Sequence, residues 1–378
     1  MRDRERAKRR LCWDPYMGSI VAHRTGFVEC RPGRVPGQGT PPSGPDHSSR
    51  ISGNLAAIVA VMSDDHHPTE AEFRAAAEQL GGIVRRTPLV PLHTGAGDDD
   101  ILLKLEIHQP IGSFKLRGVF HAVASLDERQ RSRGLSTVSA GNTAKALAWA
   151  GRHFGIEARS LMPEDAPLTK IDAVRALGGT PVLVPTAEVF RFLREHGWEQ
   201  EEFAFIHPWT DRNVRIGHGS MALEILEQCP QVETVFIPVG GGGLMGGVGA
   251  ALKLLKPSIR IVAVEPAGCP ALRASLDAGQ PANVECDTIC DGVAVPYITD
   301  EMYPLLSELA DDLILVSEAA VRATIKRLAL GNHIIAEGAG ALAAAAAQQM
   351  PAQDRGLSVC LVTGGCIDAD KLARILAE

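Results

Sequence analysis

The segment KLEIHQPIGSFKLRG, residues 104–118, carries a lysine, Lys115, directly after a serine and an aromatic residue, Ser113 and Phe114. A lysine whose amine condenses with an aldehyde becomes a covalent catalyst. Such a lysine has to be held against a flat ring, and Phe114 and Ser113 suit that environment. For so short a motif, a solvated lysine between two elements is the simpler interpretation, but three further motifs downstream favour the catalytic one.

From residue 66 onward, short apolar runs alternate with longer helical stretches. Thr69 with Glu72 three residues later forms a capping box, which predicts a helix that reaches Leu80. Residues 168–177 carry an apolar stripe and predict a second helix. The alternation indicates an α/β fold of open, mostly parallel sheets with helices on both faces. Runs rich in Val, Ile and Leu predict strands at 101–106, 136–139, 182–184, 235–239, 261–265, 313–316 and 359–363.

The length and net charge of the chain restrict its function. A chain of 378 residues exceeds the usual size of a single core, so we expect two lobes. The formal net charge of −7 removes the electrostatic case for nucleic acid as a partner. The longest apolar stretch, residues 55–62, is too short to span a bilayer, so no membrane role is predicted.

Residues 1–63 differ in composition from the rest of the chain. They open with a basic cluster interleaved with acidic residues and continue through Pro, Gly and Ser with little apolar periodicity. This composition predicts a disordered N-terminal extension. A further hypothesis is that Met62 is the true start of the native protein, because ordered sequence begins immediately after it.

The cysteines are scattered along the chain without the spacing of a disulfide framework. We therefore expect reduced thiols in a cytoplasmic protein. Cys286 and Cys290 invite a metal interpretation, but they have no second pair and no nearby histidine, so free thiols are favoured and no metal is predicted. The eight cysteines are Cys12, Cys30, Cys229, Cys269, Cys286, Cys290, Cys360 and Cys366.

The second motif, SAGNT at residues 139–143, lies between a predicted strand and a helix predicted at 144–150. Such a loop places backbone N–H groups at a helix start, where they can receive a carboxylate. Asn142 can both donate and accept hydrogen bonds, so it can contact two ligands together. An ordinary strand-to-helix turn with Asn142 as its cap is the alternative.

The third motif, VGGGGL at residues 239–244, directly follows a predicted strand. Successive glycines are tolerated where the chain approaches a ligand closely or adopts positive φ. Their amides can form an anion-binding nest, and a helix from Leu244 adds its dipole, so a phosphate fits. The dinucleotide fingerprint does not match, since no GxGxxG opens the unit. A flexible turn remains the alternative.

The fourth motif, VTGGCID at residues 362–368, follows the last predicted strand. The hydroxyl of Thr363 can hydrogen-bond the nitrogen of a pyridine ring, and such a neutral partner leaves that nitrogen largely unprotonated. The ring is then a weaker electron sink, which favours rapid loss of a β leaving group over long-lived carbanions. A strand-end threonine bonded to backbone is the alternative.

Taken in order, the four motifs resemble the fold-type II pyridoxal phosphate enzymes, the tryptophan synthase β-like group, and most closely their serine/threonine dehydratase branch. That branch carries KxExxQxxxSFKxRG, matched here from Lys104 through Glu106, Gln109 and Lys115 to Gly118. The resemblance extends from about residue 67 to the C-terminus and includes EGAG at residues 337–340. It implies pyridoxal 5′-phosphate as the cofactor and an amino acid as the substrate.

The resemblance also implies a role for each motif. Lys115 would hold the cofactor and act as the base at Cα, Phe114 would border the ring, Asn142 would contact its 3-hydroxyl and Thr363 would face its nitrogen. The phosphate would be bound by Gly240, Gly241, Gly242, Gly243 and Leu244. The substrate carboxylate would be held by Ser139, Ala140, Gly141, Asn142 and Thr143. The implied reaction converts an L-β-hydroxy amino acid of the threonine or serine type to a 2-oxo acid and ammonia.

The chain departs from the family pattern at several positions. Racemases of this branch have a second serine where Ala140 stands, and alanine cannot donate a proton, so racemisation should be minor. Thr143 replaces the usual histidine, which leaves substrate choice open. Glu265 matches one ligand of a divalent-cation site, but the second position is Ala271, so the site is questionable. No regulatory region follows before Glu378, which argues against feedback control by isoleucine.

We expect a large cofactor-binding domain at residues 64–130 and 213–378 and a small substrate-loop domain at 131–212. By resemblance, the protein would be a dimer or tetramer of identical chains.

Two other activities and one non-enzymatic role stay open. A β-replacement synthase of the cysteine synthase kind shares the Gly-Asn-Thr loop but lacks Ser-Phe-Lys and Arg-Gly. A dehydratase could also act on a bulkier substrate, such as 3-hydroxyaspartate or phenylserine. A cofactor-binding or ammonia-sensing protein without chemistry is disfavoured, because Lys115 is intact.

Overall fold

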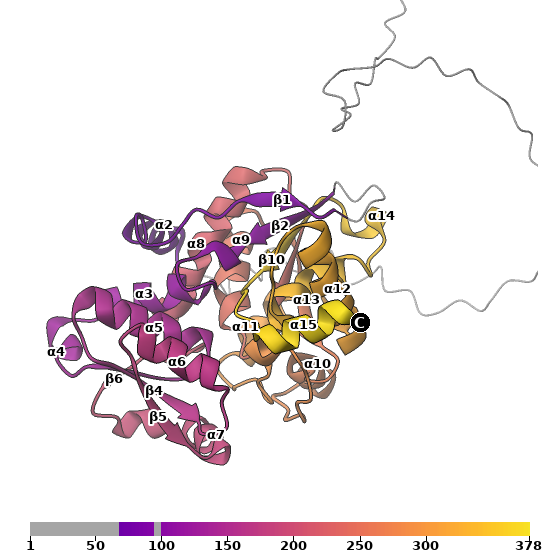
Figure 1. Ribbon diagram of the computed structural model, residues 1–378. Helices are drawn as coiled ribbons and strands as arrows, with labels where there is room; N and C mark the ends of the chain where they lie inside the picture. Colours follow the sequence, from indigo (N-terminus) through magenta and orange to yellow (C-terminus); the bar gives the residue numbers. More distant parts are fainter. Residues whose placement is uncertain (1–67, 94–99) are drawn as a thin grey trace, which may run out of the picture. The chain divides into compact units, whose positions relative to one another are not determined.

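The structure is a computed structural model in which residues 68–93 and 100–378 are described. All of these residues belong to one compact unit. Helices lie around two separate β-sheets, so the chain has the predicted α/β fold (Figure 1). The expected extension at residues 1–63 and the alternative start at Met62 lie outside the described residues.

The larger sheet has six strands in the order β1-β2-β10-β7-β8-β9. β1 is antiparallel to β2, and the other neighbouring pairs are parallel. The loops that follow parallel strands gather at one edge of a sheet, where ligands commonly bind. The strands are β1 (Leu89–Pro91), β2 (Ile101–Leu105), β7 (Thr234–Pro238), β8 (Arg260–Pro266), β9 (Asp312–Val316) and β10 (Ser358–Val362).

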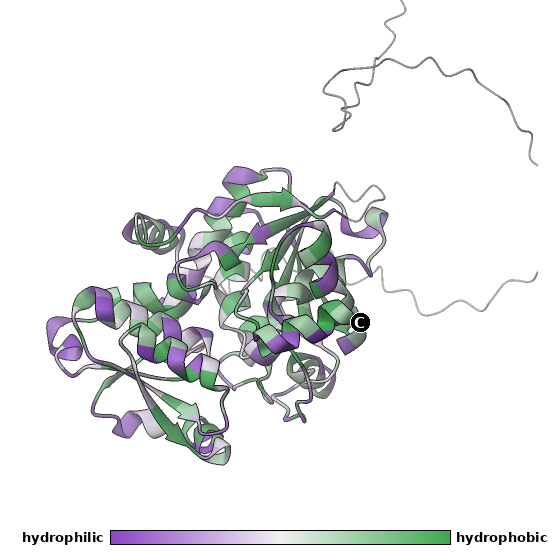
Figure 2. Ribbon diagram, viewed as in Figure 1, coloured by the Kyte–Doolittle hydropathy of each residue, from purple (hydrophilic) through white to green (hydrophobic). Residues whose placement is uncertain are grey.

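Both faces of the six-stranded sheet are buried. In β7, Val235 and Ile237 belong to one hydrophobic cluster and Phe236 to another, because successive side chains of a strand point to opposite faces. Helix α13 (Gly338–Ala347) is buried along its whole length and packs against β7, β8, β9 and β10. In Figure 2 the strands are largely apolar, whereas outer helices such as α15 (Ala369–Ala377) carry polar residues along one side.

The predicted capping box starts the first described helix, α2 (Glu70–Gln79). Thr69 Oγ1 accepts a hydrogen bond from Glu72 N at 3.3 Å, and Thr69 N donates to Glu72 Oε2 at 2.8 Å. Because Leu80 is the C-cap, the predicted extent is confirmed. The other helices outside the smaller sheet are α3 (Lys115–Ser125), α4 (Glu128–Arg131), α8 (Arg212–Gln228), α9 (Ala250–Leu255), α10 (Ala271–Ala278), α11 (Tyr303–Leu309), α12 (Glu318–Gly331) and α14 (Ala352–Arg355).

The smaller sheet has four parallel strands in the order β5-β4-β3-β6. Its strands are β3 (Leu135–Val138), β4 (Ala158–Pro163), β5 (Thr180–Val184) and β6 (Ala204–Phe205). The connections contain α5 (Asn142–Phe154), α6 (Leu168–Ala176) and α7 (Thr186–Arg194), together with the 3₁₀ turn η2 (Gly197–Gln200). This sheet therefore carries the loop of the second motif at the carboxyl end of β3.

Every predicted strand overlaps an observed one, but three observed strands were not predicted. β4 was missed because its burial alternates and it contains Arg159, so it lacks the continuous apolar run of the other strands. β1 and β6 are only three and two residues long. The strand predicted to end at Thr363 ends at Val362, which leaves Thr363 in the segment that follows.

The prediction that all cysteines are free thiols is wrong for one pair. Cys269 and Cys286 form a disulfide across a sequence separation of 17, with Cα atoms 4.4 Å apart. The returning chain is held beside Cys269 by a hydrogen bond of 2.8 Å from Asp287 N to Gly268 O, a contact that spacing alone does not reveal. In the described part of the chain, the free cysteines are Cys229, Cys290, Cys360 and Cys366.

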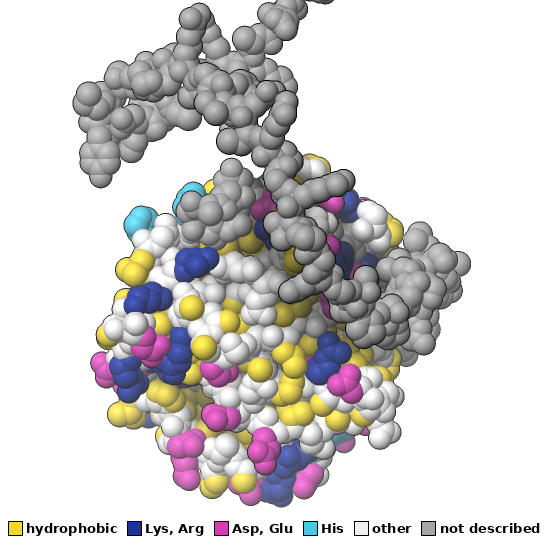
Figure 3. Space-filling model, turned by 90° about the vertical axis from the view of Figure 1, so that its right-hand side faces the viewer, with side chains coloured by type: hydrophobic (Ala, Val, Ile, Leu, Met, Phe, Trp, Pro, Cys, Tyr) yellow, Lys and Arg dark blue, Asp and Glu magenta, His cyan; other side chains and the backbone are white. Residues whose placement is uncertain are grey.

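The surface carries side chains of both charges, and no described helix is suited to cross a membrane. On the face shown in Figure 3, acidic and basic side chains are interspersed with apolar ones. Among residues 68–93 and 100–378, no helix has the length and apolar character needed to cross a membrane.

Candidate active site

All four motifs line one cavity of about 810 Å³. Its wall is formed by the start of α3, the loop between β3 and α5, the loop after β7 and the segment after β10. The structure therefore brings together all the residues that the sequence assigned to a site. They are Phe114, Lys115, Ser139, Ala140, Gly141, Asn142, Thr143, Gly240, Gly241, Gly242, Gly243, Leu244 and Thr363.

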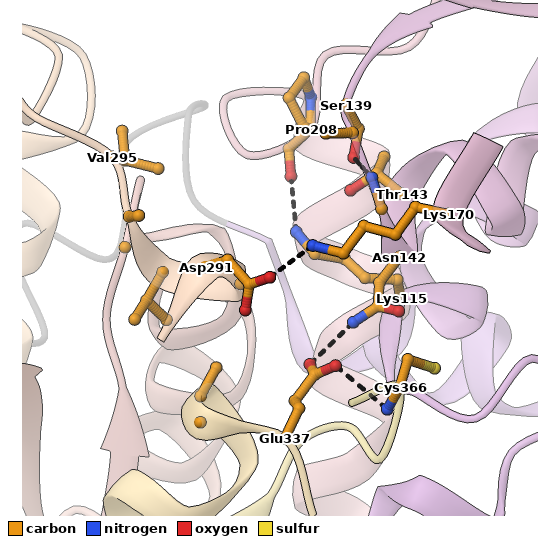
Figure 4. Close-up of a pocket in the computed structure, with 18 of the residues that line it drawn as sticks. Lys115, Ser139, Asn142, Thr143, Lys170, Pro208, Asp291, Val295, Glu337 and Cys366 are labelled. Atoms are coloured by element: carbon orange, nitrogen blue, oxygen red, sulfur yellow. Dashed lines mark hydrogen bonds and ion pairs between the residues drawn. The ribbon is translucent and has the colours of Figure 1, made fainter. Parts of the chain in front are cut away.

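Lys115 is the first residue of α3, and its side chain reaches into the cavity (Figure 4). Its Nζ donates a hydrogen bond to Pro208 O at 3.3 Å and lies 5.2 Å from the centre of the Phe114 ring. Burial lowers the pKa of Lys115 to about 8, because the ammonium loses its water, while the nearby Glu337 opposes this shift. A larger share of the amine is thus neutral near pH 7 than for a solvated lysine, as attack on an aldehyde requires.

Main-chain hydrogen bonds join the lysine motif to the fourth motif. Phe114 N donates to Thr363 O at 3.0 Å, and Gly365 N donates to Gly112 O at 3.0 Å. Thr363 itself is buried in the cavity wall. Two segments that lie far apart in the sequence are therefore held side by side, with Thr363 and Lys115 at the same cavity.

The loop of the second motif leads into the N-terminus of α5. Helix α5 begins at Asn142, and Gly141 at the N-cap position supplies no side-chain cap. The alternative in which Asn142 is the cap is therefore wrong. Gly141 N donates to Ser139 Oγ at 3.1 Å, which shapes the turn. The first amides of the helix have no intrahelical acceptor, so they can bind a carboxylate.

The glycine loop, residues 240–243, has no room for side chains. A Cβ on Gly241 would lie 2.4 Å from Cδ2 of Trp209, and one on Gly242 would lie 2.4 Å from Cδ1 of Leu306. Gly242 also has a φ of 89°, which favours glycine. Within the described residues, the amides of this loop donate to no protein acceptor, so they are available to an anion.

The helix after the glycine loop begins irregularly. A π-helical stretch, η3 (Met245–Gly249), precedes α9, whereas a plain helix was predicted from Leu244. Such π-helical turns occur often at functional sites.

A buried ionic network lies beneath the lysine motif. Arg117 pairs with Glu106 through two N–O contacts of 2.8 Å each and with Glu224 through a third of 2.8 Å. Lys104 Nζ lies 2.5 Å from Glu224. Burial pushes the pKa of Glu106 up, but Arg117, Thr87 and Lys104 together outweigh this effect, so the net shift is downward and Glu106 stays charged. The charged residues of the motif therefore anchor the first turn of α3, which carries Lys115.

Glu337 lines the cavity, and the sequence analysis placed it in the EGAG segment at residues 337–340 without assigning it a role. Its carboxylate accepts hydrogen bonds from Asn142 Nδ2 at 2.8 Å and from Cys366 N at 3.1 Å (Figure 4). Burial raises the pKa of Glu337, and Asp291 adds to that shift. In the sequence, Glu337 resembles an ordinary residue before a helix, because α13 begins directly after it.

An ion pair connects the parts of the chain built on the two sheets. Lys170 of α6 contacts Asp291 of the 3₁₀ turn η4 (Asp291–Val293), and both residues line the cavity (Figure 4). The two side chains are 26% and 41% exposed, so water screens the pair. Sequence reasoning missed it because neither residue lies in one of the four motifs.

Glu265, which matches one ligand of the divalent-cation site, accepts a backbone hydrogen bond on each of its two oxygens. Glu265 Oε1 accepts from Leu272 N at 2.7 Å, and Oε2 accepts from Arg273 N at 2.9 Å, at the start of α10. Burial raises the pKa of Glu265 to about 7, against the effect of these two bonds. Among the described residues, no three His, Cys, Asp or Glu side chains gather as metal ligands.

The cavity fits a flat ring that carries an aldehyde and a phosphate. Lys115 supplies the amine and Phe114 an aromatic neighbour, while the glycine loop supplies unpaired amides on a backbone that has no room for a Cβ. The start of α5 adds a second group of open amides for a carboxylate. These residues fit pyridoxal 5′-phosphate together with an amino acid.

Comparison with known proteins indicates the same cofactor. The family described as pyridoxal-phosphate dependent enzymes matches residues 80–364. The chain is 35% identical to an L-threonine ammonia-lyase of Thermotoga maritima over 82% of this chain and 78% of that protein. It is 38% identical to the biosynthetic L-threonine dehydratase of Escherichia coli over 66% of this chain, but spans only 49% of that relative.

The solved structures with the same fold include a serine racemase from maize. It superposes with a TM-score of 0.74 and 31% sequence identity, and the match covers 81% of this chain and 96% of the racemase. With a lysine in the cavity, its glycine loop and these relatives, the chain belongs to the family of pyridoxal phosphate-dependent enzymes.

Proposed function

We propose that this pyridoxal phosphate-dependent lyase acts on a small L-β-hydroxy amino acid, threonine or serine, and releases a 2-oxo acid and ammonia. The observation that carries the proposal is the position of Lys115 in a cavity between one loop suited to a carboxylate and another suited to a phosphate. The names of the relatives in T. maritima and E. coli support threonine as the substrate class.

Each motif then has a role in binding or proton transfer. The cofactor, when bound, supplies the electron sink for the carbanion at Cα. Lys115 holds the cofactor covalently and removes the Cα proton, and Phe114 borders the ring. Residues 240–243 with Leu244 bind the phosphate, and residues 139–143 bind the substrate carboxylate. Lys115 and residues 139–142 are half-buried in the cavity, which supports the proposal, because less water reaches the reacting atoms there.

Two residues favour elimination over other outcomes. Thr363, facing the ring nitrogen, provides a neutral partner rather than a charged one, which weakens the electron sink and favours loss of the β-hydroxyl. Ala140 lines the cavity but has no proton to deliver to the opposite face of Cα. We therefore propose that D-amino acid formation is a minor side reaction.

We also propose two domains, a homo-oligomeric assembly and a cytoplasmic location. The four-stranded sheet lies within residues 131–212, which supports the small domain, and the six-stranded sheet lies within 64–130 and 213–378. We propose a homo-oligomer, dimer or tetramer, in the cytoplasm. Sedimentation of the purified holoenzyme tests the assembly, and fractionation of the source cells tests the location.

The substrate panel tests the function directly. Purified holoenzyme is incubated with L-threonine, L-serine, 3-hydroxyaspartate and phenylserine, and 2-oxo acid and ammonia are measured, with D-serine followed by chiral chromatography. We expect 2-oxo acid from threonine or serine and little D-serine. No 2-oxo acid from any of the four, or sulfide-dependent thiol formation from an activated serine, would overturn the proposal in favour of another reaction.

A further inference from the structure

We propose that Glu337 is a positioning residue that fixes the orientation of the Asn142 amide in the cavity. The inference rests on the proposed contact between Asn142 and the cofactor ring. It goes beyond that contact, because it names the group that decides which end of the amide the ring meets.

The Glu337 carboxylate is held on both oxygens. Oε1 accepts from Asn142 Nδ2 at 2.8 Å, and Oε2 accepts from the backbone N–H of Cys366 at 3.1 Å. The side chain is only 7% exposed. A Cβ on Gly364 would lie 2.3 Å from Oε1, so the backbone at Gly364 closes off that side of the carboxylate. Glu337 is therefore fixed by the segment that also carries Thr363.

A carboxylate that accepts on both oxygens leaves Asn142 one orientation. An amide can present either its NH₂ group or its carbonyl oxygen, but only the NH₂ group can donate to Glu337. A flip would set the amide oxygen against a buried carboxylate, which is unfavourable without a compensating donor. One N–H and the carbonyl of Asn142 therefore stay in a defined arrangement for ligands in the cavity.

Burial and Asp291 raise the pKa of Glu337, and nearby cations oppose this shift. Lys145 and Lys170 both line the cavity and favour the charged form of Glu337, as does the Lys115 amine while it is protonated. Hydrogen bonds to a charged acceptor are stronger than those between neutral groups. While Glu337 is charged, its contact with Asn142 is therefore a charge-assisted hydrogen bond.

Glu337→Gln removes the constraint with little change in volume. Glutamine can accept from Cys366 N through its oxygen, but its NH₂ group then faces Asn142 and invites the amide to flip. We expect roughly tenfold weaker binding of pyridoxal phosphate, the effect of losing one hydrogen bond to a charged group. We also expect a shifted visible absorbance band of the bound cofactor. Glu337→Asp, which keeps the charge, should recover part of the affinity and the original band.

A double-mutant cycle separates positioning from general structural damage. In an Asn142→Ala background there is no amide to orient, so Glu337→Gln should change the cofactor dissociation constant by less than about twofold. The same cycle with Glu337→Ala, which removes the acceptor altogether, carries the test if the glutamine variant does not fold. Circular dichroism and thermal unfolding of each apoprotein report on folding.

The results of the double-mutant cycle distinguish positioning by Glu337 from a general loss of structure. Coupling between the two positions, together with a shifted band, supports the inference. Equal losses of affinity in both backgrounds, or an unchanged band in Glu337→Gln, would overturn it. A parent protein without any visible cofactor band would instead contradict the proposed function, so the two failures are distinguishable.

Discussion

Lys115 combines two properties that a lysine on the surface lacks. Its amine is enclosed by protein, which lowers the pKa of the amine to about 8. Lys115 is also the first residue of α3, whose first turn is held by the buried ion pair of Arg117 with Glu106. The lowered pKa makes the neutral, nucleophilic form available near physiological pH. The anchored helix limits where the amine can move, so reactivity and position come from separate parts of the structure.

The pKa of Lys115 predicts how the apoprotein captures its cofactor as pH changes. Only the neutral amine attacks the aldehyde, so the capture rate should rise about tenfold per pH unit below about pH 8 and level off above it. With an unperturbed lysine, the capture rate would level off only near the usual lysine pKa of 10.5. Absorbance stopped-flow of apoprotein mixed with pyridoxal phosphate, between pH 6 and pH 10, measures this rate. A rate still rising steeply above pH 9 would contradict the account.

At the level of single residues, the chemistry of the motifs could be predicted, but the residues that hold the motif side chains in place could not. Lys115, Asn142 and Thr363 stand in recognisable strings, and the structure places all three at one cavity. Glu337 stands in the EGAG segment, but the sequence does not reveal its role, because its partners Asn142 and Cys366 come from other parts of the chain. Contacts between distant segments depend on packing that a sequence pattern does not encode.

At the level of elements, turns and helix starts determine what the cavity can bind. The glycine loop joins β7 to a helix that begins in π-helical form, and α5 starts without a side-chain cap. In the part of the chain that the structure describes, the glycine loop and the first turn of α5 both carry backbone amides without a protein acceptor. Periodicity revealed these elements, but it could not reveal β4, whose Arg159 interrupts the apolar run, nor the π-helical stretch.

Gly241→Ala tests the glycine loop. The added methyl would lie 2.4 Å from the Trp209 ring, so the loop must shift and the amides must move from the phosphate. We expect at least about a tenfold loss of affinity for pyridoxal phosphate, comparable to one or more charged hydrogen bonds. Gly249→Ala is the matched control, since its Cβ meets no atom closer than 3.4 Å. Equal affinities of the two variants for the cofactor would argue against the loop as the phosphate site.

Arg117→Met tests the network beneath α3. Removing one partner leaves Glu106 charged and buried, which should lower the free energy of unfolding by about 3–5 kcal/mol. Arg74→Met is the control, because the exposed pair of Arg74 with Glu70 should contribute less than about 1 kcal/mol. Urea denaturation followed by circular dichroism measures both values. If both variants unfold at the same urea concentration, the network does not anchor the helix.

At the level of the whole molecule, the site depends on two sheets. The glycine loop and Thr363 follow strands of the six-stranded sheet, and the loop at residues 139–143 follows a strand of the four-stranded sheet. Lys115 begins α3, which packs against both α8 and α5. The alternation of elements predicted both sheets and their parallel strands. It could not predict the contacts between segments distant in sequence, such as the disulfide Cys269–Cys286 or the pair Lys170–Asp291.

Lys170→Met tests whether the ion pair between the two parts of the chain helps to retain substrate. The pair is partly solvated, so its loss should raise KM for threonine by about two- to fivefold, the size expected of an exposed pair, with little change in kcat. Arg175→Met on the same helix, whose partner Asp172 lies away from the cavity lining, is the control. Steady-state kinetics at low salt measures the ratio. A fall in kcat at unchanged KM would assign Lys170 to the chemistry instead.

The central claim is that the cofactor is held by Lys115, and chemical trapping tests it most directly. The holoenzyme is reduced with borohydride, digested and examined by mass spectrometry for the pyridoxyl group. The account predicts the label on Lys115, bleaching of the visible band, and loss of both in Lys115→Ala. A label on another lysine, or a visible band and full turnover that persist in Lys115→Ala, would contradict it.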